Sequence, residues 1–402
     1  MLIFHKKMKS SSSFGLLPRD TKHRRSWLCS PLPVATLFFL LLVAGSVFIA
    51  LQSKQKFLKW NLEESFQEST CKNQCRPPGS EPLPKGFIAK TSNLERRPLW
   101  GSPKKLNSSR SLFALAIGIK QKVTVDKMVQ KFVESNFAVM LFHYDGIVDG
   151  WKDFEWNDRV IHVSALNQTK WWFAKRFLHP DIVADYDFIF LWDEDIGVED
   201  FSPERYLSIV KEEGLEISQP ALDVSRSEVH HQITARGRSN VHRRMYKQGG
   251  NGTGCDDESS APPCTGWIEV MAPVFSKAAW RCVWYMIQND LIHAWGLDMY
   301  LGYCAQGDRT QKIGVVDAEY IVHYGLPTLG EPEMKPYAPE MTNLEKMKPR
   351  ESPPPKVVNF RIEVRRQSFR EYKVFRRRWM KAVEEDSCWT DPYTEPIKEI
   401  TL

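Results

Sequence analysis

Short apolar runs alternate with amphipathic stretches between residue 111 and about residue 330. Apolar runs of about four to eight residues are typical of buried strands, whereas apolar positions at every third or fourth residue are typical of helices. We therefore predict strands at Leu112–Ile119, Phe137–Phe142, Val160–Val163, Phe188–Trp192, Ile217–Leu222, Val270–Phe275 and Lys312–Val322. We predict helices at Val123–Glu134, Trp171–Val183, Arg205–Lys211 and Lys277–Gln288, the last capped by Ser276. This alternation predicts an α/β sandwich with a mostly parallel central sheet.

A longer apolar segment precedes this region. Val34–Leu51 is almost purely apolar, and no Lys, Arg, Asp or Glu occurs between Arg25 and Lys54. A helix of roughly 20 such residues spans the hydrocarbon core of a bilayer. A buried core helix would normally be amphipathic and interrupted by polar positions. We therefore predict one transmembrane helix within residues 26–53.

The charges that flank this segment predict its orientation. Three Lys residues follow it closely, whereas the residues before it include Lys6, Lys7, Lys9, Arg19, Lys22, Arg24 and Arg25. Because positive charge stays on the cytosolic side, residues 1–25 should form a cytosolic tail and the rest should be lumenal. Cleavage of a signal peptide at Ala44-Gly45-Ser46 is the alternative, but the long charged leader favours an uncleaved anchor. We expect a type II protein of the Golgi membrane, with the endoplasmic reticulum as the alternative.

Two further features agree with a lumenal location. Tripeptides that fit the N-glycosylation pattern begin at Asn107, Asn167 and Asn251. Seven cysteines follow the apolar segment, and an oxidising compartment would allow them to pair. Cys255 and Cys264 bracket a polar loop and are the first candidates for a disulfide. The odd number leaves at least one of the seven free or paired between chains.

The composition divides the lumenal part into three regions. Residues 54–110 are polar, rich in Pro and Lys, and are predicted to form a stem. Residues 111–330 are predicted to form the catalytic domain. Residues 331–402 begin with a Pro-rich linker and then carry a basic segment with helical spacing, Arg361–Lys381. A helix packed by its apolar side, with its charges in solvent, is favoured there over a surface for a membrane or an acidic ligand. The net charge of +6 lies largely at the two ends and argues against nucleic-acid binding.

The most informative motif is the acidic run that follows the predicted strand Phe188–Trp192. In an open α/β sheet, ligands bind beyond the carboxyl ends of the strands. If the extended geometry continues, Asp193 and Asp195 share one face and Glu194 points away. Two neighbouring carboxylates repel each other unless a cation lies between them. The motif therefore predicts a Mn²⁺ or Mg²⁺ site that holds the diphosphate of a nucleotide-sugar donor, although a solvated turn is the simpler alternative.

Two residues further along the chain fit the same site. Asp298 follows a predicted loop and is a candidate general base for the hydroxyl of a glycan or glycoconjugate acceptor. A helix N-cap is the alternative role for Asp298. His323 follows the last predicted strand and is a candidate third metal ligand. An ordinary polar residue at a strand end is the alternative for His323.

Weaker candidates lie after the first strands. Gly118 and Asp145 follow the first and second predicted strands, where they are expected to line a nucleotide pocket. Glu269 lies near the start of another predicted strand and is a candidate contact for the acceptor sugar. Tryptophans are numerous in this region, but most of them are expected to belong to the core.

Four long motifs carry a resemblance to a known family. They are LPKGFIAKTSNLERRPLW from Leu83, FIFLWDEDIGVEDF from Phe188, WGLDMYLGYCAQ from Trp295 and VVDAEYIVHYGLPTLG from Val315. They resemble a plant family known only as a domain of unknown function, whose members are often labelled as related to lysine-ketoglutarate reductase trans-splicing. The resemblance covers roughly residues 83–372, and the family is similar to GT-A glycosyltransferases.

The resemblance to GT-A enzymes implies roles for four residues. Asp193 and Asp195 would belong to the metal and nucleotide-sugar site, His323 would be a metal ligand, and Asp298 would lie at the acceptor or catalytic position. The reductase label would need a Gly-rich turn between a strand and a helix. The nearest candidate, Gly249–Gly254, leads into acidic residues and prolines instead.

Two functional hypotheses from different classes follow. The first is a metal-dependent glycosyltransferase that takes a nucleotide sugar and a glycan acceptor and binds no nucleic acid. The second is a non-catalytic lumenal protein that keeps the fold and serves as a scaffold of a glycan-synthesis complex. Either homo- or hetero-oligomers are compatible with the sequence. Removing the carboxylate of Asp195 should abolish activity in the first case and change little in the second.

Overall fold

The computed structural model describes residues 32–72, 76–89, 110–248, 254–326 and 360–393. The chain forms two compact units, Met1–Gln74 and Cys75–Leu402. The predicted Pro-rich linker, the cytosolic tail and the glycosylation tripeptides at Asn107 and Asn251 lie outside the described residues, as does most of the Gly-rich loop. Asn167 is described and is exposed to solvent.

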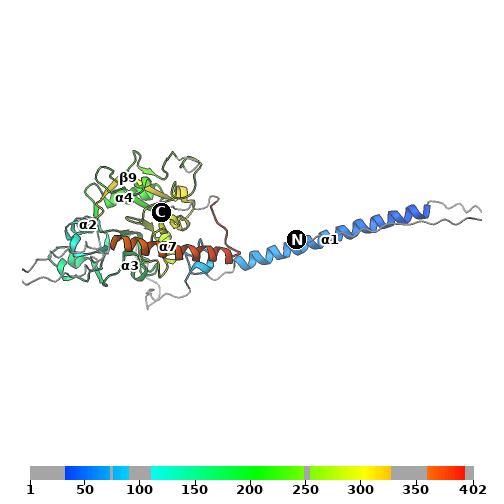
Figure 1. Ribbon diagram of the computed structural model, residues 1–402, viewed down its shortest axis with the longest axis horizontal. Coiled ribbons are helices and arrows are strands. Elements are labelled where there is room, and N and C mark those ends of the chain that lie inside the picture. Colours follow the sequence, from blue (N-terminus) through cyan, green and yellow to red (C-terminus); the bar gives the residue numbers. More distant parts are fainter. Residues whose placement is uncertain (1–31, 73–75, 90–109, 249–253, 327–359, 394–402) are drawn as a thin grey trace, which may run out of the picture. The chain divides into compact units, whose positions relative to one another are not determined.

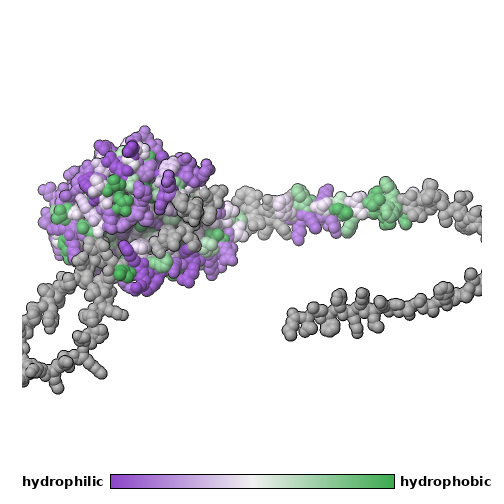
Figure 2. Space-filling view, turned by 45° about the horizontal axis from the view of Figure 1, so that its top comes forward, coloured by the Kyte–Doolittle hydropathy of each residue, from purple (hydrophilic) through white to green (hydrophobic). Residues whose placement is uncertain are grey.

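The first unit consists of one long helix, α1 (Leu32–Lys72). Its segment Thr36–Trp60 has a mean hydropathy of 2.1 and none of it is buried, so it is long and apolar enough to cross a membrane. Figure 2 shows hydrophobic side chains along this helix, whereas the surface of the second unit is mostly hydrophilic. The helix extends beyond the apolar segment, so the first part of the predicted stem, up to Lys72, is helical.

The second unit is built on a nine-stranded sheet within the described residues, with the order β3-β2-β1-β4-β8-β6-β9-β5 and β7 paired with β9. The long pairings, β1 with β2 and β4, β2 with β3, and β6 with β9, are parallel. The short pairings of β5, β7 and β8 are antiparallel. The strands are β1 (Arg110–Ile117), β2 (Ala138–His143), β3 (Ile161–Ser164), β4 (Tyr186–Trp192), β5 (Ile196–Gly197), β6 (Ile217–Leu222), β7 (Val241–His242), β8 (Val274–Ser276) and β9 (Ile313–His323). The predicted α/β class with a mostly parallel sheet is confirmed.

Helices cover both faces of the sheet (Figure 1). One core packs with α2 (Lys122–Glu134) and α4 (Pro203–Glu212), the other with α3 (Lys170–Phe177), α5 (Lys277–Met286) and α7 (Phe360–Glu385). Alternate residues of β1 enter the two cores, with Phe113 on one side and Leu112 on the other. The central strands are therefore apolar on both faces, which is why they appear as continuous apolar runs in the sequence.

Two predicted elements are about half as long as expected, and proline explains both. The helix predicted at Trp171–Val183 ends at Phe177, because Pro180 disfavours helical backbone at the residue before it. The strand predicted at Val270–Phe275 is regular only at Val274–Ser276, because Pro273 has no N–H to donate to a neighbouring strand. Ser276 caps α5 as predicted, accepting a hydrogen bond from the Ala279 N–H at 3.0 Å.

The C-terminal helix α7 packs on the body by one side, as predicted. Its buried stripe consists of Ser368, Glu371, Phe375, Trp379 and Ala382. The rings of Phe375 and Trp379 lie about 5 Å from the ring of Tyr300 in edge-to-face contact. The predicted disulfide Cys255–Cys264 is present, and a second one joins Cys282 to Cys304.

Candidate active site at the carboxyl edge of the sheet

Strand β4 ends at Trp192, and the acidic run Asp193–Asp195 follows it directly into β5. Strand β5 pairs antiparallel with the end of β9, so that Ile196 lies opposite His323. This pairing brings His323 beside the acidic run although 127 other residues separate it from Asp195 in the sequence. Glu194 contacts different elements from its two neighbours, but the chain bends at Glu194, so the alternation of Asp193 and Asp195 stays a prediction.

Glu194 is a buried carboxylate that holds the loops after β1 and β2. It accepts a hydrogen bond from the Gly118 N–H at 2.7 Å and another from the Tyr144 hydroxyl. Burial raises the pKa of Glu194 to about 8, although both hydrogen bonds favour the ionised form. A Cβ at Gly118 would overlap the Tyr144 side chain, so only glycine allows this close approach. Glu194 therefore fastens the strand ends to one another.

Asp145 has a similar structural task. Its two oxygens accept hydrogen bonds from the N–H groups of Ile119, at 2.7 Å, and Ile147, at 2.9 Å. The structure thus places both predicted nucleotide-pocket residues, Gly118 and Asp145, at the same edge as the acidic run. The Gly118 N–H and the Asp145 carboxylate already make hydrogen bonds within the chain. Their part in a nucleotide pocket would therefore be to fix the shape of the two loops.

Asp193 forms an ion pair that the sequence did not reveal. Its carboxylate lies 2.7 Å from the ammonium of Lys170, at the start of α3. Lys170 is buried and also donates to the carbonyls of Val270, at 2.7 Å, and Met271, at 3.2 Å. Loss of water raises the pKa of Asp193, while the Lys170 charge opposes that rise. Because 42% of the Asp193 side chain but only 8% of the Lys170 side chain is exposed, Asp193 is the partner that a ligand can reach.

Asp195 is buried and faces His323. One of its oxygens accepts a hydrogen bond from the Leu326 N–H at 2.9 Å and lies 3.5 Å from Nε2 of His323. The other imidazole nitrogen lies 3.2 Å from the Glu228 carbonyl. Burial alone would lower the pKa of His323, but the hydrogen bond and charge of Asp195 outweigh it and raise the pKa to about 9.

Glu269 and Asp298 form the other part of the site. Glu269 is only 9% exposed, and its Oε2 has no hydrogen-bond partner among the described residues. Burial raises the pKa of Glu269 to about 7, with His323 opposing the rise and Asp193 adding to it. Burial and the charge of Glu269 likewise raise the pKa of Asp298 to about 7. The structure therefore brings these predicted residues together in one electrostatically coupled group.

The alternative role of Asp298 as a helix cap is not what the structure shows. Asp298 lies inside a single helical turn, Leu297–Met299, whose N-cap is Gly296 with a φ of 81°. One Asp298 oxygen accepts a hydrogen bond from the Met299 N–H at 2.9 Å. The carboxylate thus belongs to a short turn at the site and does not begin a long helix.

Helix α7 fastens the loop that leads to Asp298. The backbone N–H and Nδ1 of His293 each lie 3.0 Å from a carboxylate oxygen of Glu371, which is buried on α7. A Cβ at Gly296 would overlap the ring of Tyr372, the next residue of the same helix. The C-terminal segment is therefore part of the wall behind Asp298.

The donor atoms at this edge suit a divalent ion only in part. No group of three or more His, Cys, Asp or Glu side chains close enough to hold a metal occurs in the described part of the chain. Asp195 and His323 supply an oxygen and a nitrogen, which Mn²⁺ accepts, but Asp193 is already paired with Lys170. An ion here would need substrate oxygens to complete its coordination. The metal site stays a prediction.

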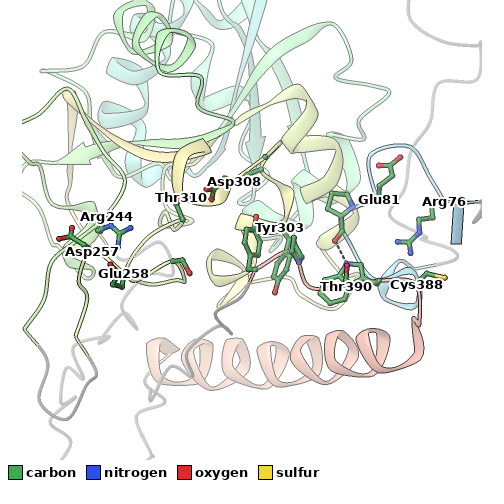
Figure 3. Close-up of a pocket in the computed structure, with 17 residues that line it drawn as sticks. Arg76, Glu81, Arg244, Asp257, Glu258, Tyr303, Asp308, Thr310, Cys388 and Thr390 are labelled. Atoms are coloured by element: carbon green, nitrogen blue, oxygen red, sulfur yellow. Dashed lines mark hydrogen bonds between the residues drawn. The ribbon is translucent and has the colours of Figure 1, made fainter. Parts of the chain in front are cut away.

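A separate cavity of about 790 Å³ lies elsewhere in the second unit. Figure 3 shows Tyr303 and Thr390 on its wall, with Asp257 and Glu258 on a neighbouring loop. Asp193, Asp195, Asp298 and His323 do not line it. The candidate active site is therefore defined by its chemistry and not by the size of a cavity.

Comparison with known proteins gives one strong match. The family model described as "Protein of unknown function (DUF707)" matches residues 74–385. No curated protein matches. Among solved structures, the chain is similar to S. aureus TarS 1-349, with 8% identity, coverage of 53% of this chain and 59% of that chain, and a TM-score of 0.33. It is also similar to the bifunctional glycosyltransferase WbbM, with 8% identity, coverage of 53% and 40%, and a TM-score of 0.28. The chain thus covers less than two thirds of either structure.

Proposed function

This chain belongs to the family described as protein of unknown function (DUF707), and from the geometry of its site we propose that it is a glycosyltransferase that uses a nucleotide-sugar donor and a glycan or glycoconjugate acceptor. The observation that carries the proposal is the pairing of two kinds of acid at one sheet edge. Asp193 and Asp195 lie beside cationic side chains, whereas Glu269 and Asp298 are carboxylates whose pKa values burial raises to about 7.

Each kind of acid has a task in glycosyl transfer. The bond between the sugar's anomeric carbon and the diphosphate breaks, and the acceptor oxygen forms the new bond to that carbon. Asp298 takes the proton of the acceptor hydroxyl, for which a pKa near neutrality is well suited. Lys170, which pairs with Asp193, would oppose the negative charge of the leaving group. A Mn²⁺ or Mg²⁺ ion held by Asp195, Asp193 and His323, with the imidazole losing its proton when the metal binds, would supply further charge stabilisation.

The proposal extends to location. One helix among the described residues is long and apolar enough to cross a membrane, which fits a single-pass membrane protein. We propose the type II orientation in the Golgi membrane, with the second unit in the lumen, on the basis of the basic residues that precede α1.

One observation favours the non-catalytic alternative. The Lys170 ammonium lies 2.7 Å from Asp193, so the cation that the acidic run requires is supplied in part by the protein itself. A scaffold that has lost its metal would be expected to keep such a pair.

Thermal unfolding of the detergent-solubilised full-length protein tests the proposal. Nucleoside diphosphates would be added with and without Mn²⁺ to the native chain, to Asp195→Asn and to the control Glu155→Gln, whose carboxylate is exposed on a loop. We expect one nucleotide to raise the midpoint in the native chain and in the control, and Asp195→Asn to lose the shift. An equal shift in all three proteins, or no shift with any nucleotide, would favour the scaffold.

A further inference from the structure

The outer face of α7 carries a row of positive charges that the packing of the helix does not require. The helix contains nine Lys and Arg residues and four Glu residues, a net charge of +5 out of +6 for the whole chain. The buried stripe that packs on the body is apolar apart from Ser368 and Glu371. The charge therefore belongs to the face that is turned to solvent.

The charges on this face follow the helical repeat. The basic stripe, as we call it, consists of Arg366, Arg370, Lys373, Arg377 and Lys381, which succeed one another at intervals of three or four residues. Residues at such intervals lie about 5–6 Å apart on one side of a helix. All five are exposed, and the stripe extends over about 22 Å at a rise of about 1.5 Å per residue.

The stripe does not stabilise the helix. Like charges at i,i+4 destabilise a helix by about 0.2–0.5 kcal/mol for each pair. The ion pairs at the stripe are exposed: Glu363 lies 2.8 Å from Arg366 and 3.9 Å from Arg370, and Lys381 lies 3.6 Å from Glu385. Exposed pairs of this kind contribute little. A ligand with repeated negative charges would offset the repulsion that remains along the middle of the row.

The opposite face of the helix links the stripe to the site. Tyr372 contacts Gly296, and Glu371 holds His293, in the loop that ends at Asp298. The same loop exposes the indole of Trp295, an aromatic surface of the kind that sugars stack on. Helix α7 thus carries the cationic row on one face and forms the wall of the acceptor side with the other, and the loop that it holds carries the exposed aromatic ring.

We propose that α7 binds an anionic glycan, a chain bearing carboxylate or sulfate groups, and that this glycan is the acceptor presented to Asp298. The second part rests on the proposed glycosyltransferase activity, whereas binding to the stripe does not. Charge complementarity favours this partner, because a row of separate cations matches a polymer with a negative charge on successive sugars. Guanidinium groups, which make up three of the five, bind carboxylate and sulfate through paired hydrogen bonds.

Binding of the detergent-solubilised full-length protein to polygalacturonate tests the proposal, with neutral dextran and phosphatidylserine vesicles as comparison probes. The test variant is Arg370→Gln/Lys373→Gln/Arg377→Gln. The charge-matched control is Lys152→Gln/Arg159→Gln/Arg238→Gln, which removes three exposed cations from other parts of the second unit. All of these side chains are exposed, so both variants should unfold at the native temperature.

We expect the test variant to bind polygalacturonate about tenfold more weakly at low salt and the control to bind like the native chain, with binding lost as salt rises. Equal binding by the two variants, or binding to the vesicles without binding to polygalacturonate, would overturn the proposal. The Mn²⁺-dependent nucleotide shift should remain in the test variant. Loss of polymer binding and failure of the transferase proposal are therefore separate results.

Discussion

Glu194 and Glu269 lie at the same edge of one sheet, and both are buried, yet they differ in what surrounds them. Glu194 accepts hydrogen bonds from Gly118 and Tyr144, whereas Oε2 of Glu269 has no partner in the described structure. A buried polar group is costly unless it is hydrogen-bonded, so an unpartnered carboxylate oxygen implies either a cost or a ligand.

The comparison separates two kinds of carboxylate in this molecule. Glu194 and Asp145 are used by the chain to fix the loops after β1 and β2. Burial raises the pKa of both Glu269 and Asp298 to about 7, and we propose that these two carboxylates act in the reaction. Changes in the first kind should act on stability, and changes in the second kind should act on activity and its pH dependence.

The largest effect is expected at Asp298. Replacement by Asn keeps the size of the side chain but removes the base, and general base catalysis contributes about 10²–10⁴-fold. Transfer from the donor that the nucleotide screen identifies should fall by that factor in Asp298→Asn, while the nucleotide-induced thermal shift is unchanged. A transfer rate within threefold or so of the native rate would remove Asp298 from the reaction.

A stability effect is expected at Glu194. Glu194→Ala leaves the Gly118 N–H and the Tyr144 hydroxyl without their acceptor. Leaving buried donors unpaired should lower the free energy of unfolding by about 2–4 kcal/mol. Thermal or urea unfolding would measure the loss, with Glu155→Ala as the exposed control. Glu194→Gln keeps an acceptor oxygen and should recover part of the stability; if the alanine variant is as stable as the control, Glu194 is not a fastening residue.

Replacement of Glu269 should raise the stability of the protein instead of lowering it. Its pKa is about 7 in the folded chain and about 4.3 when unfolded, so the folded state binds the proton more tightly. The protonated Glu269 side chain contributes its full stabilisation below pH 4.3, and this contribution is lost as the pH rises to about 7. Glu269→Gln removes that loss and should therefore be more stable than the native chain by about 2–3 kcal/mol at pH 8, with little difference at pH 4. Unfolding midpoints measured at both pH values would show the crossover, and a variant that is less stable at pH 8 contradicts it.

The sequence predicted this edge of the molecule unevenly. The acidic run after Phe188–Trp192 was identifiable because it follows a continuous apolar strand, and the α/β alternation placed it at a carboxyl edge. Lys170 was missed because a single lysine at a helix start carries no periodic signal. Its ion pair joins the start of α3 to the residue after β4, and this contact arises only in the tertiary structure.

The role of α7 was predicted only in part. Helical spacing and a packed apolar face could be read from the basic segment, but Glu371 appeared there as one more surface charge. Its burial against His293 joins residues 78 positions apart in the sequence, and no local pattern records such a contact. Pro180 and Pro273 each interrupt an apolar run. At both positions the backbone restriction imposed by proline predicts the end of the element better than the hydrophobic periodicity does.

The smallest effect is expected at Glu371. It tests whether this carboxylate of α7 only stabilises the fold or also helps to position the reacting residues. Glu371→Gln weakens the contacts with His293, and the loop it holds includes Ala294 in the left-handed conformation, with a φ of 57°. A non-glycine residue at such a φ depends on its surroundings to stay there. We expect transfer to fall about tenfold while the nucleotide-induced shift is retained, because a misplaced base costs rate and leaves donor binding intact.

Glu384→Gln changes an exposed carboxylate of the same helix and is the matched control for this prediction. In a double-mutant cycle, adding His293→Gln to Glu371→Gln should cost little more than either change alone, because the two residues act through one contact. Additive losses would mean that Glu371 stabilises α7 independently of the loop. In that case α7 would contribute only to the stability of the fold. The distinction between the two kinds of carboxylate would then apply only to those at the edge of the sheet.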